Sequence, residues 1–136
     1  MREKTLESAI IKFLELRGYY ALKIHSGAAP TISGRWMKLG DEGSPDIVCC
    51  IAGLFVAIEV KKDVATLRAW ERQWERYQKN RVVVKSSRRS IAQHLAREKI
   101  LKAGGIHMAC ADFETFQRDV LEVERIAREE QTEASA

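Results

Sequence analysis

The chain has 136 residues and a formal net charge of +4, with 46% hydrophobic and 31% charged residues. That length fits one domain, since single domains run to about 100–200 residues, and the composition excludes wholesale disorder. No uninterrupted apolar stretch approaches the ~20 residues of a membrane-spanning helix, and the charged N-terminus lacks the apolar segment of a secretory signal. We therefore expect a cytoplasmic protein with no membrane association.

The charge is distributed unevenly along the chain. Residues 1–60 hold 7 basic and 7 acidic side chains, residues 61–103 hold 13 and 4, and residues 104–136 hold 3 and 8. The basic middle segment can present a positive surface to an anionic polymer, and DNA is the default candidate. A solvated helix face balanced by the acidic C-terminal segment would have the same composition, so charge alone leaves both interpretations open.

The three cysteines, Cys49, Cys50 and Cys110, lie in apolar runs and do not form a disulfide framework. Buried free thiols are the better interpretation of that placement. A Cys/His zinc site is disfavoured, because the sequence has no C-x2-C pair and its three histidines are scattered.

The first third of the chain predicts a helix, a strand and a long connection. Thr5 is expected to cap a helix that ends near Gly18 and carries an apolar stripe of Leu6, Ile10, Phe13, Leu14 and Leu16. Tyr19–Ile24 indicates a short strand. Residues 25–45 contain four of the eight glycines and both prolines, which predicts a long loop or a loose hairpin around Arg35-Trp36-Met37. Loops of that length inside a compact domain are usually functional.

Two apolar runs, residues 47–51 and 54–58, are separated by Ala52-Gly53, which predicts a β-hairpin. Gly53 tolerates a positive φ, whereas Ala52 is less suited to a two-residue turn. The elements expected after the hairpin are a helix over 65–79 with an apolar stripe of Trp70, Trp74 and Tyr77, a strand over 81–85, a helix from a Ser90–Gln93 capping box to Lys102, a strand over 106–111, and a helix over 113–128 capped by Asp112.

These elements predict an α/β (α+β) fold in a single domain over residues 1–128, with a mixed β-sheet and flanking helices. Residues 129–136 are polar and are expected to be a disordered tail. The aromatic stripe is expected to face the core or a dimer interface rather than to stack on nucleic-acid bases.

The register of the hairpin suggests where the chemistry lies. If Ala52 and Gly53 form the turn, Asp46 lies directly opposite Glu59, with Cβ atoms only ~4.5–5.5 Å apart. Lys61 is two residues after Glu59, so it shares that face of the strand. A slip of one residue would put the two carboxylates on opposite faces.

Two carboxylates and a lysine in this arrangement suit phosphodiester hydrolysis. Asp46 and Glu59 can be ligands for a hard divalent cation, Mg²⁺ or Mn²⁺. Lys61 beside them can hold a water or stabilise a phosphate oxygen in the transition state. A surface Glu–Lys ladder at a strand end is the alternative.

The residues around Asp46 and Glu59 resemble the motif of a known family. Gly43-Ser44-Pro45-Asp46, followed after 12 residues by Glu59-Val60-Lys61, resembles the PD-(D/E)xK nuclease motif. The order of elements resembles the VRR-NUC branch of that superfamily, which is found in bacteriophages and in DNA-repair nucleases. Glu7 matches the acidic residue of the first helix in that branch. The resemblance covers about residues 5–102, so residues 104–128 would be a C-terminal extension.

The resemblance implies a restriction-endonuclease-like core and a Mg²⁺- or Mn²⁺-dependent DNA endonuclease. Family analogy adds a homodimer, selectivity for branched or junction DNA, and a phage protein acting in the host cytoplasm. Asp46 and Glu59 would hold the metal with the Val60 carbonyl, Glu7 would contact it directly or through water, and Lys61 would position the attacking water. The competing interpretation is a catalytically silent nucleic-acid-binding module on the same fold, although an intact Asp46, Glu59 and Lys61 argue against it.

The family also has a functional glutamine after the E-x-K motif, and two residues could fill that place. Gln73 lies 12 residues after Lys61, which is the typical spacing, and falls on the aromatic stripe. Gln93 lies 32 residues after Lys61 and already has a capping role. The sequence therefore favours Gln73 and leaves Gln93 as the alternative.

DNA contacts are expected from basic side chains of the middle segment and of the loop before the first motif. These residues are Lys62, Arg68, Arg72, Arg88, Arg89, Arg35 and Lys38.

Overall fold

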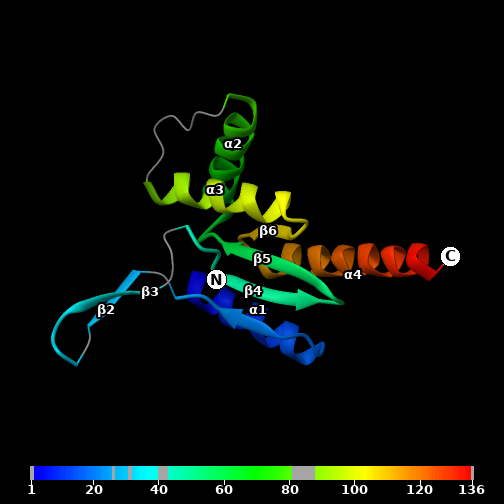
Figure 1. The fold of residues 1–136 in the computed structure, drawn as a ribbon, viewed down its shortest axis with the longest axis horizontal. Coiled ribbons are helices and arrows are strands. Elements are labelled where there is room, and N and C mark those ends of the chain that lie inside the picture. Colours follow the sequence, from blue (N-terminus) through cyan, green and yellow to red (C-terminus); the bar gives the residue numbers. More distant parts are fainter. Residues whose placement is uncertain (1, 26, 31, 40–42, 81–87, 136) are drawn as a thin grey trace.

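The computed structural model describes residues 2–25, 27–30, 32–39, 43–80 and 88–135. Helices and strands alternate through these ranges (Figure 1). The elements are α1 (Glu3–Leu16), β1 (Ala21–Lys23), β2 (Gly27–Pro30), β3 (Trp36–Leu39), β4 (Ile47–Ile51), β5 (Leu54–Val60), α2 (Val64–Asn80), α3 (Arg88–Lys102), β6 (Ile106–Cys110) and α4 (Phe113–Ser135).

The main sheet has four strands in the order β1-β4-β5-β6. β1 pairs antiparallel with β4, β4 antiparallel with β5, and β5 parallel with β6. β2 and β3 form a separate two-stranded antiparallel arm that projects from the body (Figure 1). The mixed sheet with flanking helices confirms the predicted α+β class.

The hydrophobic core lies between one face of the sheet and helices α1 and α4. Alternation along β5 points Val56, Ile58 and Val60 to this face, where each is buried. Helix α1 contributes Leu6, Ile10 and Leu14, and α4 contributes Phe116, Val120 and Val123. The opposite face carries Phe55, Ala57 and Glu59, and helices α2 and α3 lie on that side of the sheet (Figure 1).

The β4–β5 hairpin has the predicted register. Ile47 pairs with Ile58 and Ile51 with Leu54, so the turn contains only Ala52 and Gly53. Both turn residues have positive φ, 50° and 89°. Two-residue turns of this kind match the right-handed twist of the strands that they join, so the turn sets the register and places Asp46 and Glu59 at the same end of the hairpin.

The C-terminal segment belongs to the core rather than extending it. Strand β6 pairs with β5 along five residues, and three α4 side chains are in the core cluster. The Thr115 N–H donates to Asp112 Oδ1 at 2.8 Å, which confirms Asp112 as the cap of α4. Helix α4 continues to Ser135, so the expected disordered tail over 129–136 is helical as far as that residue.

Two other predicted helix caps, Thr5 and Ser90, were wrong, whereas α2 begins at Val64, within one residue of its predicted start. Helix α1 begins at Glu3 with Arg2 as its N-cap, so Thr5 lies inside it. Helix α3 includes Arg88, so Ser90 lies inside the helix and cannot be its N-cap. In both cases a hydroxyl residue that suits a cap stands within the first turns, where sequence pattern alone cannot separate the two placements.

Two burial predictions also fail. Leu16, the last member of the predicted α1 stripe, is 79% exposed at the helix end. Cys50 is exposed while Cys49 and Cys110 are buried, because alternation turns Cys50 to the face of β4 that α1 and α4 do not cover. The predicted strand over 81–85 lies outside the described residues.

Within the described part of the chain, no helix has both the length and the apolar character that crossing a bilayer requires.

The β4–β5 turn gives a test of the fold. Ala52→Asn should raise the free energy of unfolding by about 0.5–1 kcal/mol, because Asn adopts positive φ at lower cost than Ala. Gly53→Ala should lower it by ~1 kcal/mol, and a Cβ there meets no atom within 4 Å, so the cost is conformational. Urea unfolding of both variants measures the effects. A less stable Ala52→Asn protein would contradict this turn geometry.

Candidate active site

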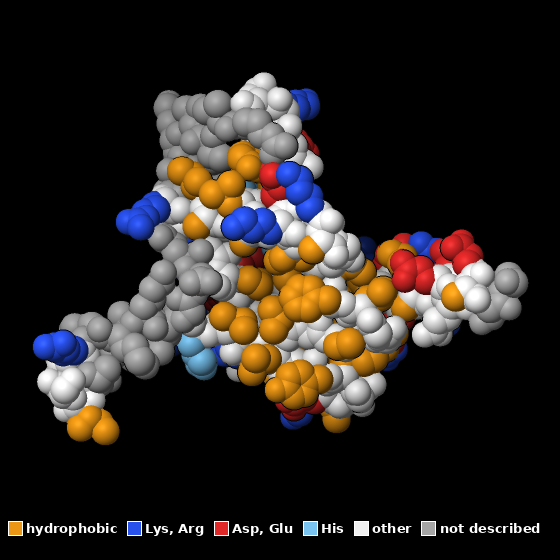
Figure 2. All heavy atoms as spheres, viewed as in Figure 1, with side chains coloured by type: hydrophobic (Ala, Val, Ile, Leu, Met, Phe, Trp, Pro, Cys, Tyr) orange, Lys and Arg blue, Asp and Glu red, His pale blue; other side chains and the backbone are white. Residues whose placement is uncertain are grey.

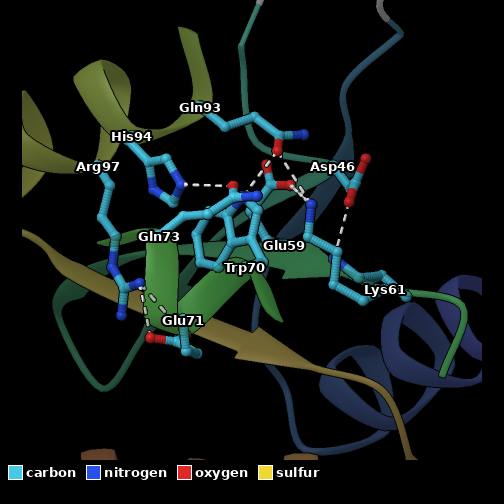
Figure 3. A network of polar contacts seen from close by, with 10 residues as sticks. Asp46, Glu59, Lys61, Trp70, Glu71, Gln73, Gln93, His94 and Arg97 are labelled. Atoms are coloured by element: carbon cyan, nitrogen blue, oxygen red, sulfur yellow. Dashed lines mark hydrogen bonds and ion pairs between the residues drawn. The ribbon is translucent and has the colours of Figure 1, made fainter. Parts of the chain in front are cut away.

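Asp46 and Glu59 lie at the ends of β4 and β5, as the register requires (Figure 3). The Val60 N–H donates to Asp46 Oδ2 at 2.7 Å, which fixes that carboxylate against the end of β5. Glu59 is 1% exposed, and its Oε2 atom accepts no hydrogen bond. Its nearest cation is Lys61, whose Nζ lies 3.7 Å from Glu59 Oε2.

Burial shapes the electrostatics of these three groups. Desolvation raises the pKa of Glu59 to about 8, and the neighbouring charge of Asp46 contributes in the same direction. Burial also raises the pKa of Asp46, with further contributions from the charges of Glu7 and Glu3. For Lys61 the sign reverses, because burial disfavours the ammonium ion and lowers the pKa. The fold therefore holds these groups where ionised carboxylates need a compensating cation.

A further acidic pair comes from α1. Carboxylate oxygens of Glu3, Glu7 and Asp46 all lie within 4.8 Å of one another. Glu7 is buried and its Oε2 lies 3.0 Å from Lys23 Nζ, and its role toward a metal stays a prediction. The sequence interpretation missed Glu3, although its i,i+4 spacing from Glu7 on one helix face was the available signal. The predicted start of the helix at Thr5 had placed Glu3 outside it.

This acidic group lines an open pocket of about 270 Å³ at the edge of the sheet. Its wall also contains three basic side chains, Lys4, Lys23 and Arg89, together with Ile24 and His25. A pocket with carboxylates beside ammonium and guanidinium groups can accept a cation and a phosphate group together.

Side chains of α2 and α3 contact the ammonium group of Lys61 (Figure 3). Its Nζ donates to Gln93 Oε1 at 2.9 Å, and the same oxygen accepts the indole N–H of Trp70, also at 2.9 Å. The Lys61 ammonium also lies 4.8 Å from the centre of a Trp70 ring. One amide oxygen therefore ties the segment directly after β5 to both helices and fixes the lysine.

Gln93, rather than the Gln73 that the sequence favours, is the glutamine that contacts Lys61. Gln73 lies on α2, partly buried, with its Oε1 3.4 Å from His94 Nε2. Gln93 is 4% exposed and contacts Lys61 directly. The spacing of 12 residues from Lys61 leads to Gln73 on α2. Gln93 instead contacts Lys61 from α3, which packs on α2. The contact with Lys61 therefore favours Gln93 as the functional glutamine.

A buried aromatic group supports this arrangement. Trp70 stacks on His94 and on His107, with ring centres 4.6 Å and 5.9 Å apart, and the Arg97 guanidinium lies over the same indole. Desolvation lowers the pKa of His94 to about 4 and that of His107 to about 3, so both imidazoles are neutral near pH 7. Trp70 and its stripe neighbours Trp74 and Tyr77 are buried, as a core interpretation predicts.

Most of the predicted DNA contacts are exposed cations. Lys62, Arg68, Arg72, Arg88, Arg89 and Arg35 are exposed, whereas the side chain of Lys38 lies outside the described residues. Figure 2 shows Lys and Arg side chains over α2 and α3 and at the end of the arm, and acidic side chains on α4. Both signs of charge occur in each region, since Arg97 of α3 pairs with Glu71 of α2 and Arg125 of α4 pairs with Glu122, so the excess of cations on α2 and α3 is one of number rather than of complete separation.

The residues present fit a divalent cation. Carboxylate oxygens are hard ligands of the kind that Mg²⁺ and Mn²⁺ prefer. The buried Glu59 Oε2 has no hydrogen-bond donor, which is costly unless a water donates to it or a cation coordinates it. The Val60 N–H is directed to Asp46, and the role of the Val60 carbonyl stays a prediction.

Comparisons of the chain with family models, with curated protein sequences and with solved structures gave no match. The resemblance to VRR-NUC nucleases therefore rests on the motif residues themselves.

The burial of Glu59 predicts a pH-dependent stability. Its pKa rises from 4.5 to about 8 on folding, so the folded chain binds this proton more tightly than the unfolded chain. In metal-free protein Glu59 therefore contributes a fall in the free energy of unfolding between pH 4.5 and about 8, whereas His94 and His107, which burial keeps neutral, contribute a rise below pH 6.5. The fall should accordingly be measured between pH 6.5 and about 8. Glu59→Gln should remove that fall and be more stable than the parent at pH 8.

Urea unfolding in EDTA at several pH values measures this effect. Glu75→Gln, at an exposed position of α2, is the matched control and should keep the pH dependence of the parent. Equal pH slopes for the parent and Glu59→Gln would contradict the assignment.

Proposed function

We propose that this protein is a metal-dependent DNA endonuclease of the VRR-NUC type. The observation that carries the proposal is the buried Glu59–Lys61 pair, opposite Asp46 at one end of the hairpin. A structural Glu–Lys ladder would be solvated at a strand end, whereas here the glutamate is 1% exposed and one of its oxygens has no hydrogen bond. Burying ionisable groups in this way costs stability, which is typical of functional sites.

The carboxylates would hold the metal. Asp46 and Glu59, together with Glu7, are the expected ligands for Mg²⁺ or Mn²⁺. The carboxylates grouped within 4.8 Å of one another are those of Glu3, Glu7 and Asp46, so Glu3 could add a further oxygen, while Glu59 lies outside that group and influences Asp46 through its charge. Such an ion, when bound, would polarise a phosphoryl oxygen and lower the pKa of a water. The chain's own contribution is to keep these carboxylates in a partly desolvated setting, where they attract a cation more strongly than in water.

Lys61 would act on the water or on the phosphate oxygens. Gln93 and Trp70 fix its ammonium group, so little reorganisation is required when charge develops on the phosphate. The lowered pKa brings the amine closer to a state that can accept a proton from water. Both roles need the same placement of Nζ, beside Glu59.

Binding of the nucleic acid would come from the exposed cations. Lys4, Lys23 and Arg89 line the pocket that contains Glu7 and Asp46, so a phosphate there would face positive charge. The exposed arginines of α2 and α3 would contact phosphates farther along the DNA. From the resemblance we also propose a homodimer that acts on branched or junction DNA in the cytoplasm.

A cleavage assay tests the function directly. Single-stranded, duplex and four-way-junction DNA should be cut by the purified protein with Mg²⁺ or Mn²⁺ and left intact with excess EDTA. Lys61→Ala should lower the single-turnover rate by ~10²–10³-fold with DNA affinity nearly unchanged, because a preorganised transition-state contact is lost. Lys12→Ala, at an exposed position of α1 outside the basic middle segment, is the matched control and should cut within about threefold of the parent, since screened surface charges act weakly.

Two results would separate the alternatives. Undiminished cleavage in EDTA would refute the metal requirement. DNA binding without cleavage of any substrate in either metal would identify a catalytically silent nucleic-acid-binding module.

The two glutamines give a second test. Gln93→Ala should lower the single-turnover rate by about 10-fold to 10²-fold, because Lys61 loses the acceptor that orients it. DNA affinity should stay the same, since Gln93 is buried and acts through Lys61 as a positioning residue. Gln73→Ala, on the neighbouring helix, is the matched control, and a larger rate loss there would restore the original assignment.

A further inference from the structure

The β2–β3 arm is the part of the fold that neither the core nor the candidate active site explains. Its strands pair only with each other, from Gly27 opposite Leu39 to Pro30 opposite Trp36, and belong to a sheet of their own. Figure 1 shows the arm projecting away from the body. A two-stranded hairpin that stands alone is only marginally stable in water, so it gains stability when a partner covers it.

The tip of the arm carries an apolar side chain next to a cation. Ile32 has a relative exposure of 110%, which makes it more exposed than any large hydrophobic residue in the core elements. Arg35, three residues later, is also exposed, and Gly34 takes the positive φ of the turn between them. A lone exposed isoleucine is ordinary on a protein surface. Ile32 differs in its place, at the end of a projecting arm and beside an arginine.

The charge of the arm favours nucleic acid over protein as its partner. Residues 27–39 contain two basic residues, Arg35 and Lys38, and no acidic residue. A narrow basic β-arm with an apolar tip resembles the elements that enter the minor groove of DNA, where an apolar side chain wedges between base steps and kinks the duplex.

The base of the arm lies at the candidate active site. Ile24 and His25, which precede β2, line the same pocket as Asp46, which follows β3 along the chain. Each strand has four residues, or about 13 Å at the usual rise, which is comparable to the length of about four base pairs.

We propose that the β2–β3 arm is a DNA-binding element in which Ile32 inserts between base steps of the minor groove and Arg35 contacts a flanking phosphate. The inference rests on the proposed function and adds a substrate preference to it. DNA that is already kinked or unstacked, as at a branch point, requires less energy for such insertion than a regular duplex. The arm would therefore select deformable DNA beside the scissile phosphate.

Binding in EDTA tests the arm without cleavage. The probes are a regular duplex and a four-way junction with 2-aminopurine at the branch point, whose fluorescence rises when the base unstacks. Ile32→Ala should abolish most of the fluorescence rise and weaken junction binding by about tenfold, the loss expected for one buried isoleucine. Arg35→Gln should weaken binding and reduce the salt slope of log K by about one.

Matched controls come from α4. Leu121→Ala removes another exposed apolar side chain and Arg128→Gln another exposed cation, and both should bind as the parent does. Light scattering of each variant without DNA reports whether the arm instead contacts a second copy of the chain.

The outcomes separate the arm from the active site. Unchanged affinity and fluorescence for Ile32→Ala, or a parent protein that does not bind DNA, would overturn the inference. An altered oligomeric mass for Ile32→Ala with unchanged DNA binding would make the arm a protein contact instead. Loss of the fluorescence rise in a protein that cuts no DNA with Mg²⁺ or Mn²⁺ would support the arm and refute only the nuclease activity.

Discussion

Three elements of the fold meet at the side-chain oxygen of Gln93. It accepts hydrogen bonds from Lys61 of the segment after β5 and from Trp70 of α2, while Gln93 itself belongs to α3. A buried ammonium group requires an acceptor, and a buried indole N–H requires one as well. By satisfying both, one amide holds α2 and α3 against the sheet and gives Lys61 a fixed position, so packing and chemistry depend on the same contact.

The surrounding aromatic rings explain why this contact is stable. Trp70, Trp74, His94 and His107 form a stack in which both imidazoles are neutral, because burial lowers their pKa values. The cations near the stack, Lys61 and Arg97, lie over ring faces, where the quadrupole of the indole favours positive charge. Aromatic rings and the cations that lie over them therefore cover the sheet face that carries Glu59 and partly exclude water from it. Charged groups in such a setting interact more strongly than they would in water.

The sequence predicted the parts of this site that depend on local order. The turn residues determined the β4–β5 register and hence the placement of Asp46 and Glu59, because a two-residue turn leaves one pairing. The role of Gln93 could not be predicted, since the packing of α3 on α2 is a long-range contact that no spacing along one helix reveals. Glu3 was missed for a smaller reason, because helix ends are uncertain by one or two residues and its partner Glu7 was assigned to the first turn. For the arm, the glycine and proline content is compatible with a loop and with a hairpin, so the sequence alone does not distinguish the two.

The distribution of the three thiols has a practical consequence for following how the protein opens. Cys50 is exposed, whereas Cys49 and Cys110 are buried on the other face of the sheet, where burial raises the pKa of each to about 12. Alkylating reagents attack the thiolate, so a folded chain should accept one label rapidly and two more only when α1 or α4 separates from the sheet. The rate of the slow labelling would therefore time the opening of the core, and mass spectrometry could follow it without any engineered probe.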